Sequence, residues 1–188
     1  MNDCRKAGLA HYAVTIIGKD RPGIVADTAQ VLFALGCNVE DSSCTMLGGE
    51  FAMILIISHP KPFSKKSLEA EFAAKNSGSG LSAFIRTLKD DEVCYREQQG
   101  ELCLVSVYGS DKPGIVYRIT RELADRGVNI TDLNTKLIGS PAEPVYVLML
   151  EAVLPPDMSA DDASQLLGNL KKELNVEISV RLITPVSL

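Results

Sequence analysis

The second half of this chain repeats the first. Residues 18–48 align with residues 109–139 at a constant offset of 91, and eleven of the 31 aligned pairs are identical. A repeat of this length indicates one structural unit present twice, so the 188 residues form two small domains. We expect a first domain at 1–97, with an N-terminal extension, and a second at 101–188, joined by Gln98–Gly100.

Each copy opens with the same order of hydrophobic patterns. Apolar, β-branched runs predict the strands, and apolar residues at helical spacing predict a helix after the first strand. Gly36 and Gly127 stand where a glycine ends such a helix. The predicted strands are His11–Ile17, Asn38–Leu47 and Phe51–Ser58 in the first copy and Leu102–Tyr108, Asn129–Ile138 and Val145–Val153 in the second.

A second helix and a last strand are expected to close each copy. In the second copy the helix carries a leucine stripe through Leu174, and the strand is Val176–Ile183. In the first copy we place the helix on Leu81, Phe84, Ile85 and Leu88 and the strand at Glu92–Glu97. Residues 59–80 are interpreted as an inserted segment with a short charged helix near Ser67–Lys75 and a flexible loop after it.

The order β-α-β-β-α-β in both copies predicts an α+β fold. It consists of two ferredoxin-like units in tandem, each with an antiparallel sheet and helices on one face. Both third strands are apolar at nearly every position. A strand of this kind is usually buried on both sides, so the second face of each sheet is expected to be covered as well.

A repeated turn, Asp20-Arg21-Pro22-Gly23 and Asp111-Lys112-Pro113-Gly114, joins the first strand to the first helix. Proline suits the first turn of a helix, and glycine lets another backbone or a ligand approach closely. The free N–H groups that follow can bind a carboxylate, and the aspartate can accept from an ammonium group. The turn therefore suits an α-amino acid, although the same residues also make a good helix start without a ligand.

This order of motifs resembles the ACT domain, a small βαββαβ ligand-binding module. The resemblance rests on D-x-P-G-I-V, an amphipathic helix, G-x-N, and a glycine between the next two strands, all present twice. More narrowly, 11–15, 20–25, 36–42 and 46–51 resemble the tandem-ACT regulators typified by the glycine cleavage system transcriptional repressor.

The resemblance implies amino-acid sensing where two ACT units meet, through pairing edge to edge along the second strand or back to back through helices. The small amino acid is expected to be one such as glycine or serine, and a homodimer is expected. The implied ligand-binding residues are Asp20, Arg21, Pro22, Gly23, Ile24 and Asn38 in the first copy and Asp111, Lys112, Pro113, Gly114, Ile115 and Asn129 in the second.

Composition narrows the function classes. A net charge of −5 and an aromatic content of 5% without Trp disfavour direct nucleic-acid binding. No apolar run is long enough to span a membrane, and no signal peptide is recognised, so we expect a cytoplasmic protein without membrane contact. The five cysteines form no C-x-x-C pair and are expected to be reduced and mostly buried.

No catalytic or metal-binding motif is recognised in the sequence, and no cofactor is expected. We therefore predict a non-catalytic, amino-acid-sensing regulator that modulates transcription or metabolism through a protein partner. Two alternatives stay open: a regulatory subunit of an amino-acid metabolic enzyme, and a structural adaptor that binds no ligand.

Overall fold

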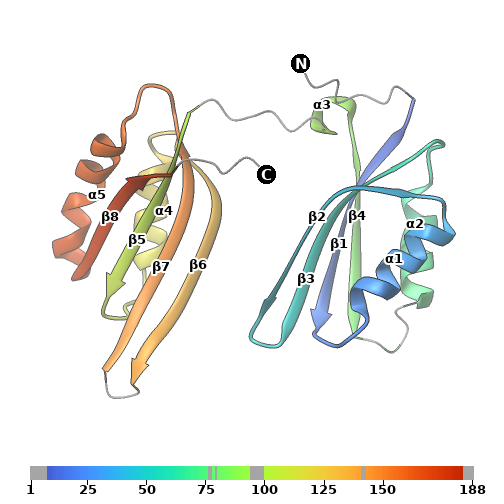
Figure 1. Cartoon of the computed structure of the whole chain (residues 1–188), viewed down its shortest axis with the longest axis horizontal. Coiled ribbons are helices and arrows are strands. Elements are labelled where there is room, and N and C mark those ends of the chain that lie inside the picture. The colour runs from blue at the N-terminus through green and yellow to red at the C-terminus, as the bar shows by residue number, and fades with distance from the viewer. Residues whose placement is uncertain (1–7, 76–77, 79, 94–99, 141–142, 184–188) are drawn as a thin grey trace. The chain divides into compact units, whose positions relative to one another are not determined.

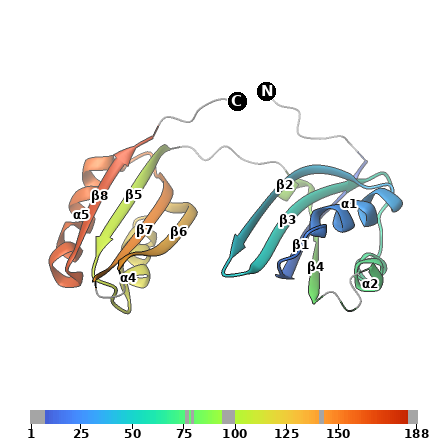
Figure 2. The ribbon, with the colours of Figure 1, turned by 60° about the horizontal axis from the view of Figure 1, so that its bottom comes forward.

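The chain divides into two compact units, Met1–Arg96 and Glu97–Leu188. The structure, a computed structural model, describes residues 8–75, 78, 80–93, 100–140 and 143–183. Each unit contains one four-stranded antiparallel sheet with its two long helices on one face (Figures 1 and 2). The predicted tandem of ferredoxin-like βαββαβ units is confirmed.

The first unit has the strand order β2-β3-β1-β4, so β1 and β3 lie in the middle of the sheet and β2 lies at an edge. Its strands run antiparallel to their neighbours throughout. Its elements are β1 (Ala10–Lys19), α1 (Ile24–Ala34), β2 (Asn38–Leu47), β3 (Glu50–His59), α2 (Lys65–Lys75), β4 (Leu81–Leu88) and a short α3 (Asp90–Val93).

The second unit has the equivalent order, β6-β7-β5-β8. Its last helix begins with a capping box, in which the Ser159 hydroxyl accepts from the Asp162 N–H while the Asp162 carboxylate accepts from the Ser159 N–H. Its elements are β5 (Glu101–Gly109), α4 (Ile115–Ala124), β6 (Asn129–Ser140), β7 (Glu143–Leu154), α5 (Ala160–Leu174) and β8 (Val176–Leu182).

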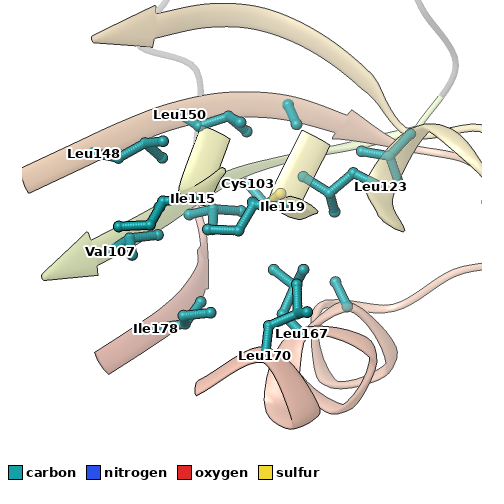
Figure 3. Packing of buried hydrophobic residues seen from close by; sticks show 14 of the residues in the cluster. Cys103, Val107, Ile115, Ile119, Leu123, Leu148, Leu150, Leu167, Leu170 and Ile178 are labelled. Carbon is teal, nitrogen blue, oxygen red and sulfur yellow. The ribbon is translucent and has the colours of Figure 1, made fainter. Parts of the chain in front are cut away.

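Each unit has its own hydrophobic core between the sheet and the helices. In the second unit, Val107 of β5, Ile119 of α4 and Leu167 of α5 are fully buried and point toward one another (Figure 3). In the first unit, Val14 and Ile16 of β1 pack with Leu32 of α1 in the same way. Alternate residues of each central strand enter the core, which is the pattern of a sheet covered by helices on one side.

The prediction for the last part of the first unit was wrong. Leu81–Leu88, expected as a helix, is strand β4, which pairs with β1 from Gly18↔Leu81 to His11↔Leu88. The second helix is α2, within the segment interpreted as an insertion, and its Leu68 and Phe72 are each 1% exposed. The expected last strand, Glu92–Glu97, begins inside α3, which includes residues 92 and 93, and 94–97 lie outside the described residues.

The first unit does not by itself cover both faces of its sheet. On the face away from the helices, Ile54 of β3 is 53% exposed and its neighbour across the sheet, Phe84 of β4, is 60% exposed. Thr15 of β1 lies between them in the register. Nothing in the described part of this unit shields these side chains, so the expected cover of the second face does not come from this unit and stays a prediction.

The edge strands β2 and β6 carry the same irregularity. The pairing of β2 with β3 shifts between Val39 and Asp41, and the pairing of β6 with β7 shifts between Ile130 and Asp132. The extra residue of a β-bulge increases the local twist of a strand. The two units therefore share this bulge as well as their topology.

Candidate functional site

The repeated turn lies where β1 ends and α1 begins. The Asp20 N–H donates to the Gly49 carbonyl at 2.9 Å, which ties the turn to the β2–β3 hairpin. Gly23 is the N-cap of α1 with φ of 92°, a left-handed conformation that favours glycine. Among the residues that the structure describes, no side chain caps this helix, so its first-turn N–H groups are not satisfied by a capping residue there.

The turn in the second unit has the same geometry. Gly114 is the N-cap of α4 with φ of 96°, again without a side-chain cap, and its carbonyl accepts from the Arg118 N–H at 2.9 Å. The helix begins in the same way in both units, at Ile24 and Ile115. The positive end of each helix is therefore available to an anionic group in both turns.

A groove lies beside the first turn, between α1 and the edge strand β2, with a volume of about 660 Å³. Its polar groups come from the turn, and its remaining surface is mostly apolar. The residues that line it are Asp20, Arg21, Gly23, Ile24, Val25, Ala26, Ala29, Cys44, Thr45, Met46 and Phe51.

The groove exists because β2 extends beyond the cover of the helices. Cys44 pairs with Met53 and Met46 pairs with Phe51, and both partners belong to the core, so these β2 residues are on the helix side of the sheet. Both are nevertheless exposed, and Met46 is 67% exposed. The small side chains of Ala26 and Ala29 on α1 leave space opposite them.

Arg21 is held in place by an acidic residue of α1. Its Nη2 donates to Asp27 Oδ2 at 2.8 Å, and the Lys75 ammonium of α2 lies 3.7 Å from Asp27 Oδ1. The hydrogen bond from Arg21 lowers the pKa of the Asp27 carboxyl, with a further contribution from Lys75. Asp27 therefore stays ionised and keeps the guanidinium of Arg21 beside the groove.

Four of the six residues predicted for the first site line the groove: Asp20, Arg21, Gly23 and Ile24. Pro22 is in the same turn without being one of its lining residues. Asn38 is at the opposite end of β2, where it pairs with Ser58 and its Nδ2 donates to Glu40 at 2.8 Å. Leu47 lies nine residue steps along the strand from Asn38, or about 30 Å, so one unit does not bring Asn38 to the turn.

In the second unit, too, the predicted asparagine lies far from the predicted turn. Asp111, Lys112, Pro113 and Gly114 form an exposed turn, whereas Ile115 is 1% exposed and belongs to the core. Asn129 begins β6 opposite Val153, at the far end of the strand.

Several lining residues were not predicted from the sequence. The cysteines were expected to be mostly buried, but Cys44 is exposed and lines the groove. Met46, Ala26 and Ala29 likewise line the groove. The available signal was weak: two alanines three apart on a helix, and apolar residues at alternate positions of a strand that leads toward the turn.

The described residues contain no group of three or more His, Cys, Asp or Glu side chains able to hold a metal ion. Among the helices that the structure describes, none has the length and apolarity needed to cross a membrane.

Comparison with known proteins identifies the same domain in both halves of the chain. The model of the ACT domain matches residues 11–84 and 101–180. The glycine cleavage system transcriptional repressor of Escherichia coli (strain K12) is 30% identical over 176 residues, which cover 92% of this chain and 90% of the repressor.

Two solved structures cover nearly the whole chain. A protein of unknown function from Galdieria sulphuraria has a TM-score of 0.79 and 25% identity, covering 94% of this chain and 99% of that one. A candidate glycine cleavage system transcriptional repressor has a TM-score of 0.69 and 21% identity, covering 95% and 100%, and supports the fold. The chain therefore belongs to the ACT-domain family, with two ACT domains in tandem, and is related to the glycine cleavage system transcriptional repressor.

Proposed function

We propose that this protein is a non-catalytic sensor of a free amino acid that regulates transcription or metabolism through a protein partner. Its two ACT domains and its relation to a transcriptional repressor support a regulatory role. The net charge of −5 argues against direct contact with DNA phosphates, which basic side chains normally make. Control of transcription would therefore act through a protein partner.

The observation that carries this proposal is the groove beside the uncapped start of α1. The first-turn N–H groups and the Arg21 guanidinium suit a carboxylate, because both supply donors and positive charge. The Asp20 side chain lines the same groove and suits an ammonium group. These two kinds of partner at one end of a groove match the two charges of an α-amino acid.

Pairing with a second copy of the chain would complete this site. β2 is an edge strand of the described sheet, and an edge strand of this kind can pair with a strand of another chain. In an antiparallel pair of β2 strands, the Leu47 end of one lies beside the Asn38 end of the other. The amide of Asn38, far from its own turn, would then reach the turn of the second copy.

Amino-acid binding is tested by thermal unfolding and calorimetric titration of the full chain with each of the twenty amino acids. A ligand at about 100 times its dissociation constant stabilises the fold by about 2.7 kcal/mol, which a shift in unfolding temperature reveals. Arg21→Ala should reduce the shift, whereas Lys61→Ala, which removes an exposed cation outside the groove, should not. If none of the twenty shifts the transition, the sensor function is wrong and an adaptor remains.

The partner separates the two regulatory classes. Co-purification of the tagged chain, with and without the amino acid that binds, should recover a DNA-binding protein if transcription is controlled. Recovery of an amino-acid metabolic enzyme whose activity changes with the chain and its ligand would instead favour the regulatory-subunit alternative.

A further inference from the structure

Resting on the proposed function, we propose that the groove of the first unit selects an amino acid with an apolar side chain of about the size of leucine, methionine or phenylalanine, and not glycine or serine. The inference concerns the part of the ligand beyond its two charged groups. It follows from the composition and size of the groove and from the residues that keep it open.

The charged and uncharged parts of the groove are separated. Asp20 and Arg21 contribute the ionisable groups, and both belong to the turn at one end. Away from the turn the lining is almost entirely apolar, from Val25, Ala26 and Ala29 of α1 and Cys44, Met46 and Phe51 of the sheet. A ligand held by its charges at the turn therefore projects its side chain along an apolar surface.

The volume of the groove exceeds what the smallest amino acids occupy. Its volume of about 660 Å³ leaves room for a side chain beyond the two charged groups of the ligand. Glycine has no side chain, so it would leave the exposed Met46 and Val25 side chains in contact with water. A larger apolar side chain would displace that water and cover these residues, which favours its binding.

Polar side chains are disfavoured by the same lining. Outside the turn, Thr45 supplies the one side-chain hydroxyl among the lining residues of the groove, and no ionisable group other than the Cys44 thiol is among them. A charged or amide-bearing ligand would lose its hydration there without gaining partners. The flexible Met46 side chain, which is 67% exposed, can adjust to apolar ligands of different shape.

Two alanines keep the groove open, and they are particular to the first unit. The offset of 91 places Tyr117 at the position of Ala26 and Thr120 at that of Ala29. α1 and α4 begin at equivalent residues, so these pairs occupy equivalent helical positions. The larger side chains take up room beside the second turn, and the preference for an apolar side chain is therefore assigned to the first unit alone.

Calorimetric titration of the full chain with glycine, serine, alanine, leucine, methionine and phenylalanine tests the assignment. Because each added methylene in an apolar pocket changes affinity by about tenfold or more, at least one of the three large ligands should bind at least tenfold more tightly than glycine. Tightest binding by glycine or serine would overturn the inference and leave the sensor function standing. Binding by none of the twenty amino acids would overturn both.

Variants locate the binding. Ala29→Phe fills the groove and should weaken leucine, methionine and phenylalanine selectively. Ala34→Phe is a matched control, since Ala34 is exposed on the same helix and does not line the groove. Equal effects of the two substitutions on the large ligands would contradict the assignment.

Modification of Cys44 provides a readout that does not need a substitution. This thiol lines the groove and is exposed, so a bound apolar side chain should slow its alkylation in the unsubstituted protein. Ligand that binds tightly but leaves the alkylation rate of Cys44 unchanged would place the side chain elsewhere and overturn the inference. Circular dichroism tests whether Ala29→Phe remains folded. If this variant does not fold, the alkylation rate of Cys44 in the unsubstituted protein tests the inference.

Discussion

Arg21 Nη2 lies 2.8 Å from Asp27 Oδ2, so the cation of the first repeated turn is fixed by the first turn of the helix that follows it. The carboxylate is shared with Lys75 of α2, whose ammonium also donates to Gln30 at 2.7 Å. The position of Arg21 thus depends on two helices.

Replacing Asp27 by Asn should weaken amino-acid binding several-fold with little change in unfolding temperature. The substitution removes the partner that orients Arg21, whereas partly exposed ion pairs contribute little to stability. Calorimetric titration and thermal unfolding measure the two effects. Glu173→Gln, which breaks the Arg118–Glu173 pair of the second unit, is the matched control and should leave binding to the first unit unchanged.

The contribution of Asp27 to stability should depend on pH in a defined direction. The pKa of its carboxyl is lowered by the hydrogen bond from Arg21, so the folded chain holds the proton less tightly than the unfolded chain. The stabilisation is present above the unfolded pKa, near 3.8, and is lost as pH falls through the lower folded pKa. The difference in stability between the protein and Asp27→Asn should therefore be small at neutral pH and disappear in strong acid. A constant difference across this range would contradict the ionised pair.

The capping box of α5 makes a second prediction about stability. Ser159→Ala should destabilise the second unit by about 1 kcal/mol at neutral pH, because it removes the N-cap oxygen. The hydrogen bonds from Ser159 lower the pKa of Asp162, so this cost should shrink as pH falls through the folded pKa of that carboxyl. Denaturant unfolding at neutral and acid pH measures the change. A cost that grows in acid would show that the carboxylate is not the partner.

Phe72→Ala should destabilise the first unit by about 3–5 kcal/mol, the usual cost of removing a buried aromatic side chain. Phe72 is 1% exposed on α2, within a segment whose sequence resembles a surface insertion. Denaturant unfolding compared with the exposed neighbour Glu71→Ala measures the difference. Equal stability of the two variants would show that α2 is peripheral to the core.

The described cysteines should differ sharply in reactivity. Cys103 is fully buried, and burial raises the pKa of its thiol. Cys44 is exposed. Peptide-resolved alkylation of the native protein should modify Cys44 readily and Cys103 only after denaturation, since the thiolate is the reactive form. Rapid modification of Cys103 in the folded protein would contradict the core of the second unit.

The sequence predicted the fold well where the two copies agree. The strand, turn and helix from Gly18 to Leu32 recur from Gly109 to Leu123. Where the copies diverge, the short helix expected near Ser67–Lys75 is present as α2, but the helix expected after it is not. Leu81, Phe84, Ile85 and Leu88 fit helical spacing, but pairing with β1 makes them a strand in which Ile85 is buried and Phe84 is exposed. Local periodicity cannot supply that information, because the partner strand is about 70 residues away.

The candidate site was predicted only in part, because only one part of it is local in sequence. The turn is local in sequence, so its residues were found directly. The groove depends on β2 lying at a sheet edge beyond the helices, which a linear pattern does not reveal. Asn38 was expected at the site from the family resemblance, but within one unit it lies at the opposite end of β2 from the turn.

The bulge that interrupts β2 between Val39 and Asp41, and β6 between Ile130 and Asp132, has a consequence for assembly. A strand with a kink near its start offers an incoming strand only one stretch of regular backbone, from Asp41 to Leu47 in β2. Two such edges that meet head to tail cannot slide past each other without losing hydrogen bonds at the kink. The bulge would therefore fix the pairing register of two such strands. A shift of one residue would turn every side chain to the opposite face of the sheet.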